Sequence, residues 1–524
     1  MAQAAWLIVA PLLLGSALPA QHVGGSWEMK HKFHHPIADE QFGQSVDAAG
    51  DANADGWPDV VIGAPWADFG GVYNCGAVHL ISGRDGSTLW TAYGLRLQHA
   101  LGGYVGGGGD VNRDGFDDVI AGNFALGSEV LVFSGFDGTV LFTFVAPESG
   151  FGRGVDVAGD LNADGYDDVV VGSSEDHVFA YSGADGSLLF SVTLATDSQA
   201  AVAGVGDVNL DGHDDVLAGA AGDVFSPAAY LISGKDGRTL RVFDYAPGSY
   251  TGLGHAVGDA GDVNADGVPD IVIGAPGADR FLINAGAAYV YSGRYYLRLH
   301  QFDGWVEGLG LGSAVDGAGD ANGDGHADLI ISAGADAVLY SGADGSILTE
   351  YASPYAGVSL GGPVAGAGDV DRDGFDDVIF GDPAANAAGI AGLIPFLTLS
   401  ADELSLGSGN PVTAAIAFPE SEAGYRYALL ASITGTGPTT LYGIEVPLTP
   451  DKVFNRMLSG SVSPANPDAF GVLDAHGRAT AGLFGHVSLT PLLGANVYLA
   501  AVSYDMLGPL ARLSSVSRAL AIVP

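Results

Sequence analysis

Seven short acidic loops hold the residues of this sequence that could do chemistry. Residues 159–172 read GDLNADGYDDVVVG, and the loop pattern within them, Asp-x-Asn/Asp-x-Asp-Gly-x-x-Asp, occurs seven times along the chain. Side-chain oxygens at positions 1, 3 and 5 can curl around one cation, while the glycine at position 6 permits a sharp turn. Position 7 offers its carbonyl, and the aspartate at position 9 closes the cage. The spacing therefore predicts a binding site for a hard cation in each loop.

Each loop is predicted to supply four side chains and one main-chain carbonyl, the carbonyl coming from position 7. The predicted ligands are Asp51, Asn53, Asp55, Trp57, Asp59, Asp110, Asn112, Asp114, Phe116, Asp118, Asp160, Asn162, Asp164, Tyr166, Asp168, Asp207, Asn209, Asp211, His213, Asp215, Asp262, Asn264, Asp266, Val268, Asp270, Asp320, Asn322, Asp324, His326, Asp328, Asp369, Asp371, Asp373, Phe375 and Asp377.

Calcium is the cation that this ligand set favours, with up to seven ions per chain. Ca²⁺ accepts flexible all-oxygen cages, whereas Mg²⁺ requires rigid octahedral geometry and keeps its waters. An EF-hand would need a bidentate glutamate at position 12 and flanking helices. Position 12 is apolar in every loop, being Ile62, Ala121, Val171, Ala218, Ile273, Ile331 and Phe380. A single such loop could be an Asx-rich turn without metal, but seven crowded sets of carboxylates favour cations, because unneutralised they would repel one another.

The loops recur with a spacing of 47 to 59 residues, which indicates a repeat architecture. Each unit begins with an aromatic residue or leucine followed by glycine, as in Phe42-Gly43, and continues through a small-residue strand into the acidic loop. A continuous apolar run such as 60–62 then predicts a strand buried on both faces. A third strand such as 77–83, an Asp-Gly turn and a fourth strand such as 88–94 complete the unit. Four-stranded units repeated seven times predict a seven-bladed β-propeller; a solenoid would leave two open ends that need caps.

The two ends of the repeat region indicate how the ring closes. The seventh unit stops at its predicted third strand, residues 391–400, without an Asp-Gly turn or a fourth strand. Residues 26–36 lie directly ahead of Phe42-Gly43, where every other unit has its fourth strand. We therefore expect the N-terminal strand to complete the last blade and so remove the open sheet edges.

The motifs of these units resemble the FG-GAP repeat of integrin α-subunit propellers. The resemblance rests on Phe-Gly, the acidic loop and Gly-Ala-Pro at 63–65 and 274–276, and it covers about residues 26–400. It implies calcium loops on the lower face of a seven-bladed propeller and ligand contacts on the opposite face. Integrin α propellers carry the calcium motif in only some blades, so its presence in all seven suggests a bacterial-type relative in which calcium is general scaffolding. Gly-Ala-Pro is incomplete in several units, for instance at 172–174.

Charge and the N-terminus predict an extracellular protein. The net charge is -42, of which residues 401–524 contribute -3 from nine acidic and six basic side chains; such a surface repels nucleic acid and anionic membranes. Residues 1–20 resemble a signal peptide, although no Lys or Arg precedes Lys30, and a short buried segment is the alternative. No other stretch is apolar enough for a spanning helix. We expect a secreted or cell-surface monomer whose single cysteine, Cys75, is a core residue.

Residues 401–524 read as a separate all-β domain after the propeller of residues 21–400. Alternating segments at 412–418, 425–433, 479–485 and 496–504, separated by turn residues, predict a β-sandwich-like fold without helices. Such a domain could bind glycan or cell wall, or act as a sorting or spacer module.

The sequence favours a non-catalytic protein for adhesion or recognition of an extracellular protein or glycan. Catalytic elbows, zincin motifs and phosphate loops are absent. The histidines at 31, 34 and 35 are expected on an exposed outer strand, and His213 and His326 are expected to leave their side chains free. Aromatics in the upper loops are the candidate contact surface or ordinary packing residues: Trp66, Phe69, Tyr73, Phe225 and Phe281. The alternatives are an extracellular hydrolase or lyase acting on polysaccharide or phosphoesters, and a structural display or spacer protein.

Overall fold

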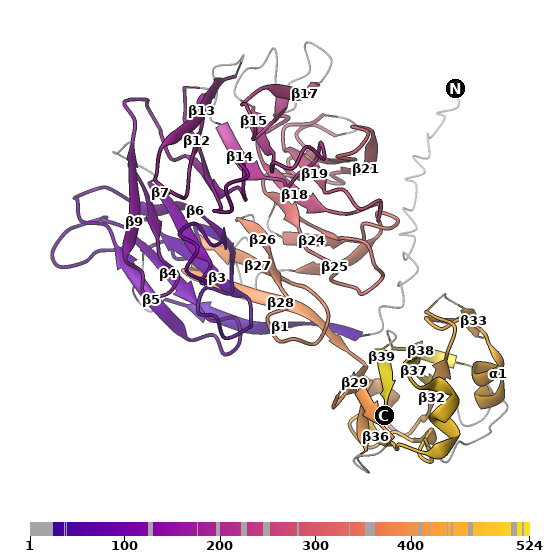
Figure 1. Cartoon of the computed structure of the whole chain (residues 1–524). Coiled ribbons are helices and arrows are strands. Elements are labelled where there is room, and N and C mark those ends of the chain that lie inside the picture. The colour runs from indigo at the N-terminus through magenta and orange to yellow at the C-terminus, as the bar shows by residue number, and fades with distance from the viewer. Residues whose placement is uncertain are drawn as a thin grey trace, which may run out of the picture. The chain divides into compact units, whose positions relative to one another are not determined.

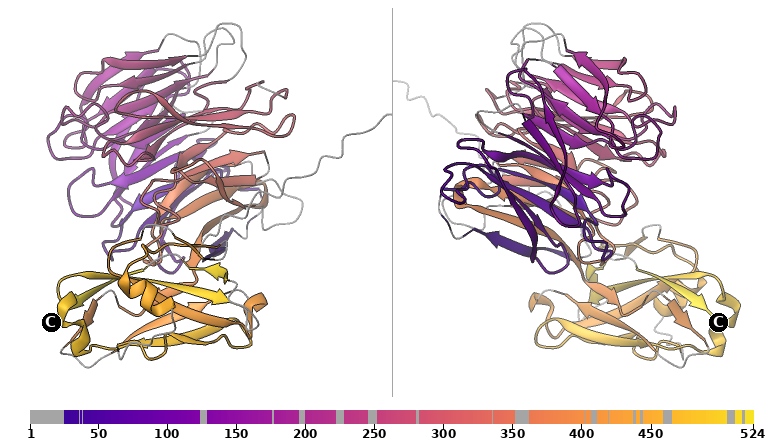
Figure 2. Two further views of the ribbon diagram at one scale, coloured as in Figure 1. Left: turned by 90° about the vertical axis from the view of Figure 1, so that its right-hand side faces the viewer. Right: turned by 60° about the vertical axis from the view of Figure 1, so that its left-hand side comes forward.

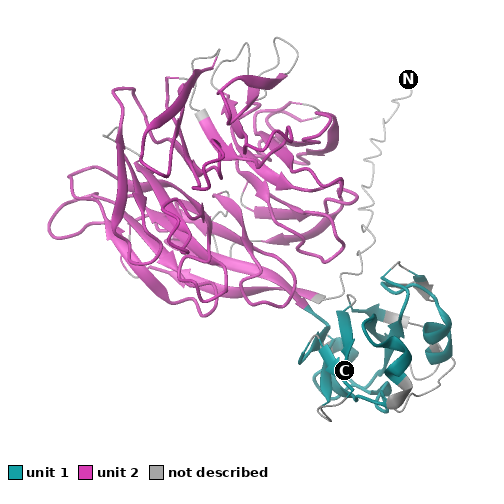
Figure 3. Cartoon of the chain, in the orientation of Figure 1, with its two compact units in different colours: residues 1–25, 395–524 teal, residues 26–394 magenta. Residues whose placement is uncertain are grey.

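The structure is a computed structural model whose contacts divide the chain into two compact units, residues 26–394 and residues 395–524 (Figure 3). It describes residues 25–35, 37, 39–123, 129–175, 177–194, 200–221, 228–244, 252–279, 282–334, 336–351, 362–401, 403–406, 411–418, 420–436, 439–441, 444–458, 465–504, 511–515 and 518–524. The predicted signal peptide, Phe225 and Phe281 lie outside the described residues.

The described part of the first unit contains seven sheets of four strands. Sheets 1 to 6 run in chain order: β2 (Ser45–Gly50), β3 (Asp59–Ala64), β4 (Ala77–Ile81) and β5 (Thr88–Tyr93); β6 (Leu101–Gly109), β7 (Asp118–Asn123), β8 (Glu129–Phe133) and β9 (Val140–Val145); β10 (Gly154–Val157), β11 (Val169–Gly172), β12 (His177–Tyr181) and β13 (Leu188–Thr193); β14 (Ala200–Gly204), β15 (Val216–Ala220), β16 (Ala228–Ile232) and β17 (Thr239–Asp244); β18 (Val257–Gly261), β19 (Asp270–Ala275), β20 (Ala287–Tyr291) and β21 (Arg298–Asp303); β22 (Val315–Gly317), β23 (Leu329–Ala333), β24 (Asp336–Tyr340) and β25 (Ile347–Tyr351).

Sheet 7 combines the two ends of the repeat region, with the strand order β1 (Gly25–His34), β28 (Ala387–Pro395), β27 (Asp377–Asp382) and β26 (Val364–Gly368). The predicted third strand at 391–400 is wrong in its bounds. β28 starts four residues earlier and ends at Pro395, while β29 (Leu397–Leu399) pairs with β31 of the second unit. A proline lacks the N–H needed to continue the ladder, so the chain leaves sheet 7 there.

The first strands of the seven sheets contact one another in cyclic order, β2, β6, β10, β14, β18, β22, β26 and again β2. Figure 1 shows β6, β14, β18 and β26 near a common centre, and Figure 2 shows the same sheets from two further sides. Seven buried apolar clusters each combine residues of two adjacent sheets, including one between sheets 7 and 1. This nearly all-β arrangement is consistent with a β-propeller.

The second strands are buried on both faces, as their apolar runs predict. Every residue of β3, β7, β11, β15, β19, β23 and β27 is buried. The fourth strands β5, β9 and β13 are half-buried or exposed over most of their length. A β-branched run is therefore packed between two neighbouring sheets, where burial of each Val or Ile stabilises the fold by roughly 1.5–3 kcal/mol.

The second unit contains two larger sheets that share one buried core. One sheet joins β29, β31 (Val412–Ala417) and β36 (Arg478–Leu483); the other joins β30 (Glu403–Ser405), β39 (Arg518–Val523), β37 (Asn496–Tyr504), β32 (Arg426–Ser432), β35 (Phe470–Val472) and β38 (Ala511–Ser514). β33 (Thr439–Leu441) and β34 (Ile444–Val446) form a separate pair. The four predicted segments thus correspond to β31, β32, β36 and β37.

The expectation that residues 401–524 lack helices is wrong. This unit contains the α-helix α1 (Lys452–Leu458) and the 3₁₀ helices η2 (Glu420–Glu422) and η3 (Val487–Leu492); a further one, η1 (Pro383–Ala385), lies in sheet 7. Asp451 caps α1, because its Oδ1 accepts a hydrogen bond from the Phe454 N–H at 2.8 Å. An aspartate directly before the first helical residue is a helix-start signal, but a helix of seven residues is too short to produce a clear apolar period.

Candidate metal loops and their surroundings

The seven acidic loops join the first and second strands of each sheet, and the first aspartate organises each loop. In the first loop, Asp51 Oδ1 accepts from the Asp55 N–H at 2.9 Å and Oδ2 accepts from the Gly56 N–H at 2.8 Å. The same two bonds occur in all seven loops, at 2.8–2.9 Å. Positions 1, 5 and 6 are therefore held together in each loop by one carboxylate.

The ninth aspartate of every loop is fully buried. In six loops its Oδ1 accepts from the glycine N–H that follows the third strand, at 3.0–3.3 Å. Burial raises the pKa of these six carboxyl groups: to about 7 for Asp59, Asp118, Asp168 and Asp215, to about 6 for Asp270 and to about 8 for Asp328. Burial and neighbouring carboxylates disfavour the ionised form of these groups, and a nearby cation would favour it.

The side-chain oxygen of the asparagine at position 3 indicates whether these loops fit a cation. The side-chain oxygens of Asn112 and Asn162 are buried without a hydrogen-bond partner. Unpartnered buried oxygens are rare because each costs roughly 1–3 kcal/mol. Each lies in a loop whose other side-chain donors are carboxylates, the oxygen set that Ca²⁺ takes. The residues of these loops therefore fit a calcium ion.

The seventh loop differs from the others. Among the described residues, it alone brings three carboxyl groups within 4.8 Å of one another, from Asp369, Asp371 and Asp373. Lys30 of β1 lies among them, with its Nζ 2.7 Å from Asp371 Oδ2 and 2.9 Å from Asp377 Oδ1. The five predicted positions of this loop lie between β26 and the start of β27, and the sequence analysis did not predict the lysine beside them.

The expectation that His213 and His326 have free side chains is wrong. The Nδ1–H of His213 donates to the Leu161 carbonyl at 2.8 Å, and that of His326 donates to the Val263 carbonyl at 2.8 Å. Each acceptor is position 2 of the acidic loop in the preceding sheet. These rings therefore link neighbouring loops, a contact that needs two sheets side by side.

Aspartates at position 8 make a second link between loops that the sequence analysis missed. Oδ2 of Asp117, Asp167, Asp214 and Asp376 accepts from the N–H of the first aspartate in the preceding loop, at 2.7–2.8 Å. Burial raises the pKa of Asp117, Asp167 and Asp214. Their only signal in the sequence is a doubled Asp-Asp at the loop end.

Four further carboxylates lie on the innermost strands, where the sheets meet. They are Asp47 on β2, Asp156 on β10, Asp259 on β18 and Asp316 on β22. Asp156 Oδ2 accepts from the Gly204 N–H at 2.8 Å, and Asp316 Oδ2 accepts from the Gly366 N–H at 3.1 Å. Desolvation where the sheets meet raises the pKa of Asp156 to about 7 and of Asp316 to about 8, and that of Asp47 well above its usual range.

The predicted histidine strand is only partly exposed. His34 is exposed, but His35 is half-buried, with its Nδ1 2.6 Å from Oε2 of the buried Glu40. The His35 ring also stacks on Phe42 at 5.8 Å. The strand therefore contacts sheet 1 as well as sheet 7, which corrects the expectation of a fully solvated outer strand.

The connections at the sheet ends opposite the acidic loops carry exposed apolar side chains. In sheet 1 these are Phe69, Tyr73, Leu95 and Leu97, and in sheet 5 they are Leu282, Ile283, Trp305 and Val306. Phe69 and Tyr73 were predicted, whereas Trp66 is half-buried and donates its indole N–H to Gln41 Oε1. Main-chain bonds from Gln98 to Tyr73 and from Gly308 to Ile283 hold the two connections of each sheet together.

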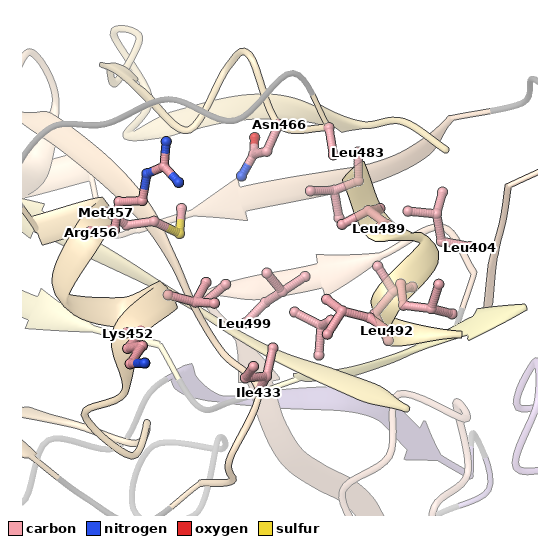
Figure 4. A pocket seen from close by; sticks show the side chains of 16 residues that line it. Leu404, Ile433, Lys452, Arg456, Met457, Asn466, Leu483, Leu489, Leu492 and Leu499 are labelled. Carbon is pink, nitrogen blue, oxygen red and sulfur yellow. The ribbon is translucent and has the colours of Figure 1, made fainter. Parts of the chain in front are cut away.

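The second unit contains a partly open, mainly apolar pocket of about 450 Å³. Figure 4 shows Lys452, Arg456 and Met457 of α1 on one side, with Leu404, Leu489 and Leu492 on the other. The Asn466 side-chain oxygen, buried without a hydrogen-bond partner, belongs to its wall. No helix in the described part of the chain is long and apolar enough to cross a bilayer.

Comparison with known proteins places these repeats in a family. Residues 42–81 and 256–291 match the FG-GAP repeat, and residues 160–218 match the FG-GAP-like repeat. The chain contains FG-GAP repeats. It is 34% identical over 126 residues to integrin alpha-PS5 of Drosophila melanogaster, which is 23% of this chain and 12% of that protein. It is 35% identical over 109 residues to integrin alpha pat-2 of Caenorhabditis briggsae, which is 19% of this chain and 9% of that protein. The chain thus spans only about a tenth of the length of these relatives.

The geometry of this structure explains why the FG-GAP motif has glycine at these positions. Gly43 adopts φ +88°, and a Cβ at Gly63 would lie 1.9 Å from the Gly102 carbonyl oxygen of sheet 2. The same approach joins Gly381 of sheet 7 to the Gly43 carbonyl, at 2.0 Å. No side chain fits at such distances, so these glycines let the main chains of neighbouring sheets meet.

Proposed function

We propose that this chain is a secreted, calcium-binding, non-catalytic β-propeller that recognises an extracellular protein or glycan. In this proposal the seven sheets are the blades, β1 closes the ring, residues 21–400 form the propeller and residues 401–524 form a separate sandwich-like domain. The buried ninth aspartate, repeated in every acidic loop, is the observation that carries it.

Calcium would be held by the carboxylates of positions 1, 5 and 9, the side-chain oxygen of position 3 and the carbonyl of position 7. The ion supplies the positive charge that lets the buried carboxylates ionise together. Because position 1 follows the first strand and position 9 begins or directly precedes the second, the ion would tie those two strands. Position 8 and the linking histidines extend that tie to the neighbouring blade.

Elemental analysis of the purified full-length protein tests the calcium proposal. We expect calcium in multiple equivalents per chain after dialysis at millimolar Ca²⁺, and a large loss of thermal stability after chelation. Protein that carries no calcium and has the same Tm with and without chelator would contradict the proposal.

Recognition would use the exposed apolar connections of sheets 1 and 5. Exposed aromatic and aliphatic side chains are typical of recognition surfaces, and here hydrogen bonds hold the main chain that carries them. The integrin relatives support a binding role for such a propeller.

Binding to immobilised glycans and extracellular-matrix proteins tests the recognition surface. We expect Trp305→Ala to weaken a detected interaction at least tenfold. Tyr295→Ala is the control, because Tyr295 is also an exposed aromatic residue but lies in the turn at the other end of sheet 5. Equal effects of both substitutions would contradict the assigned surface, and turnover of a polysaccharide would support an enzyme instead.

A further inference from the structure

The seventh acidic loop already contains a cation from the chain itself. The Lys30 ammonium lies 2.7 Å from Asp371 Oδ2, 3.3 Å from Asp373 Oδ2 and 2.9 Å from Asp377 Oδ1. Its side chain is only 5% exposed. Three of the four predicted side-chain ligands of this loop therefore face a positive charge that comes from β1, at the other end of the repeat region.

The position of Lys30 is occupied by leucine in every other sheet. Gly86 lies against the His31 ring of β1 just as Gly138 lies against the Trp90 ring of β5, which aligns Lys30 with Leu89. The equivalent residues of the six other fourth strands are Leu89, Leu141, Leu189, Leu240, Leu299 and Leu348. All six are half-buried and pack against the apolar clusters between sheets. The lysine is thus a departure confined to the strand that completes sheet 7.

The third strand of sheet 7 has room for the lysine. A Cβ at Gly392 would lie 3.0 Å from Lys30 Cε and 1.7 Å from Asp377 Oδ1. By the register of β27 and β28, Gly392 occupies the place of Ser82 in sheet 1. A serine there would block the approach of the ammonium to the ninth aspartate, so Gly392 and Lys30 form a matched pair.

The sequence of the seventh loop also differs from the others at the positions that face Lys30. Position 3 is Asp371 here and asparagine in the six other loops. In those loops a glycine N–H donates to Oδ1 of the ninth aspartate, whereas Asp377 Oδ1 faces the ammonium, and Leu393 stands at the glycine position. The Lys30 ammonium thus contacts carboxylate oxygens of Asp371, Asp373 and Asp377 at 2.7–3.3 Å.

We propose that Lys30 is the resident cation of the seventh loop, so that this loop closes the ring without a metal ion while the six asparagine-containing loops bind calcium. The inference rests on the proposed calcium binding of those six loops. The N-terminal strand thus supplies one positive charge to a loop of four carboxylates, so pairing of this strand and partial charge compensation of the loop depend on each other.

Metal stoichiometry of matched variants tests the proposal. We expect native protein to bind one calcium ion for each of the six asparagine-containing loops. Lys30→Leu, which restores the residue of the other sheets, should gain one ion. Lys32→Leu is the control, because Lys32 lies on the same strand with an exposed side chain; it should leave the count unchanged. Seven ions in native protein, or no gain in Lys30→Leu, would overturn the inference, whereas native protein without calcium would overturn the proposed function.

Amine acylation followed by peptide mass spectrometry gives a second measurement on native protein. Lys30 should stay at least tenfold less reactive than Lys32 in both calcium and chelator, because no metal displaces it. Calcium-dependent exposure of Lys30 would overturn the inference, since it would show that the ion and the ammonium compete for one loop. This measurement does not require the Lys30→Leu variant to fold.

Discussion

The buried ninth aspartate accepts hydrogen bonds that hold both the loop and the turn after the third strand. Asp168, for example, accepts from the Gly183 N–H at 3.0 Å and from the Asn162 N–H at 3.2 Å, and it is fully buried. The first bond ties the second strand to the turn after the third strand, and the second fixes the loop. As a ligand it would add a third tie. Loss of one carboxylate should therefore affect metal binding and stability together.

We predict that Asp168→Asn removes one calcium ion and destabilises the protein. The amide can keep one acceptor oxygen but sets its NH₂ against a main-chain donor, which costs roughly 1–3 kcal/mol. Denaturant unfolding in calcium, with metal analysis, measures both effects. Asp185→Asn is the control in the same sheet, because Asp185 is exposed in a turn and accepts from the Ser187 N–H. A native calcium count in Asp168→Asn would show that this residue is not a ligand.

At the scale of elements, β1 connects two interfaces. Trp27 and Met29 pack against the cluster between sheets 6 and 7, and Phe33 packs against the cluster between sheets 7 and 1. The strand also covers the edge of β28, whose main-chain groups would otherwise be open to another chain. β1 thus packs against the apolar clusters on both sides of sheet 7, covers the edge of β28 and brings the Lys30 charge to the seventh loop.

We predict that deletion of residues 21–36 lowers Tm and promotes self-association. The deletion exposes β28 and leaves the carboxylates of the seventh loop without their ammonium. Calorimetry and light scattering measure the two effects, and addition of a peptide of residues 21–36 should reverse them. A monomer with the native Tm would contradict a closing role for β1.

At the scale of the whole molecule, acid concentrates where the sheets meet. The acidic loops lie at one end of each sheet, and Asp47, Asp156, Asp259 and Asp316 lie on the innermost strands. A carboxyl group whose pKa is raised on folding binds a proton more tightly in the folded state. Such a group contributes stability below the unfolded pKa of about 4, and this contribution is lost as pH rises through the folded pKa.

We predict that the chelated protein has a higher Tm at about pH 5 than at about pH 8. The window follows from the pKa values of about 6 to 8 of the ninth aspartates and the inner-strand carboxyl groups. Calcium should reduce the decline, because it stabilises the ionised loops. Calorimetry from about pH 5 to about pH 8 measures this change in Tm. A chelated protein whose Tm rises from about pH 5 to about pH 8 would contradict the prediction.

We predict that Asp316→Asn stabilises the protein at about pH 8 and has little effect at about pH 5. The amide keeps an acceptor for the Gly366 N–H and removes a carboxyl group whose burial raises its pKa to about 8. The expected gain is on the order of 1 kcal/mol, or a few degrees in Tm. Equal shifts at both pH values would indicate a packing effect instead.

The sequence by itself determined the loops, the strands and the turns, because each depends on residues close together in the chain. The alternate-position oxygens of residues 51–59, the buried run at 60–62 and the Asp-Gly turn at 84–86 follow from local geometry. The resemblance to FG-GAP repeats also rests on such short motifs. The helix α1 was not predicted, because seven residues are too few to show a helical period of apolar residues.

Tertiary structure alone decided which charges meet. Lys30 and Asp377 are 347 residues apart, so no local pattern pairs the lysine with the seventh loop, and His213 finds its carbonyl acceptor in the preceding sheet. The position-8 aspartates likewise have no evident partner in the sequence, because each accepts its hydrogen bond from the loop of a neighbouring sheet. Electrostatic contacts of this kind depend on distance in space, which only the packed sheets set.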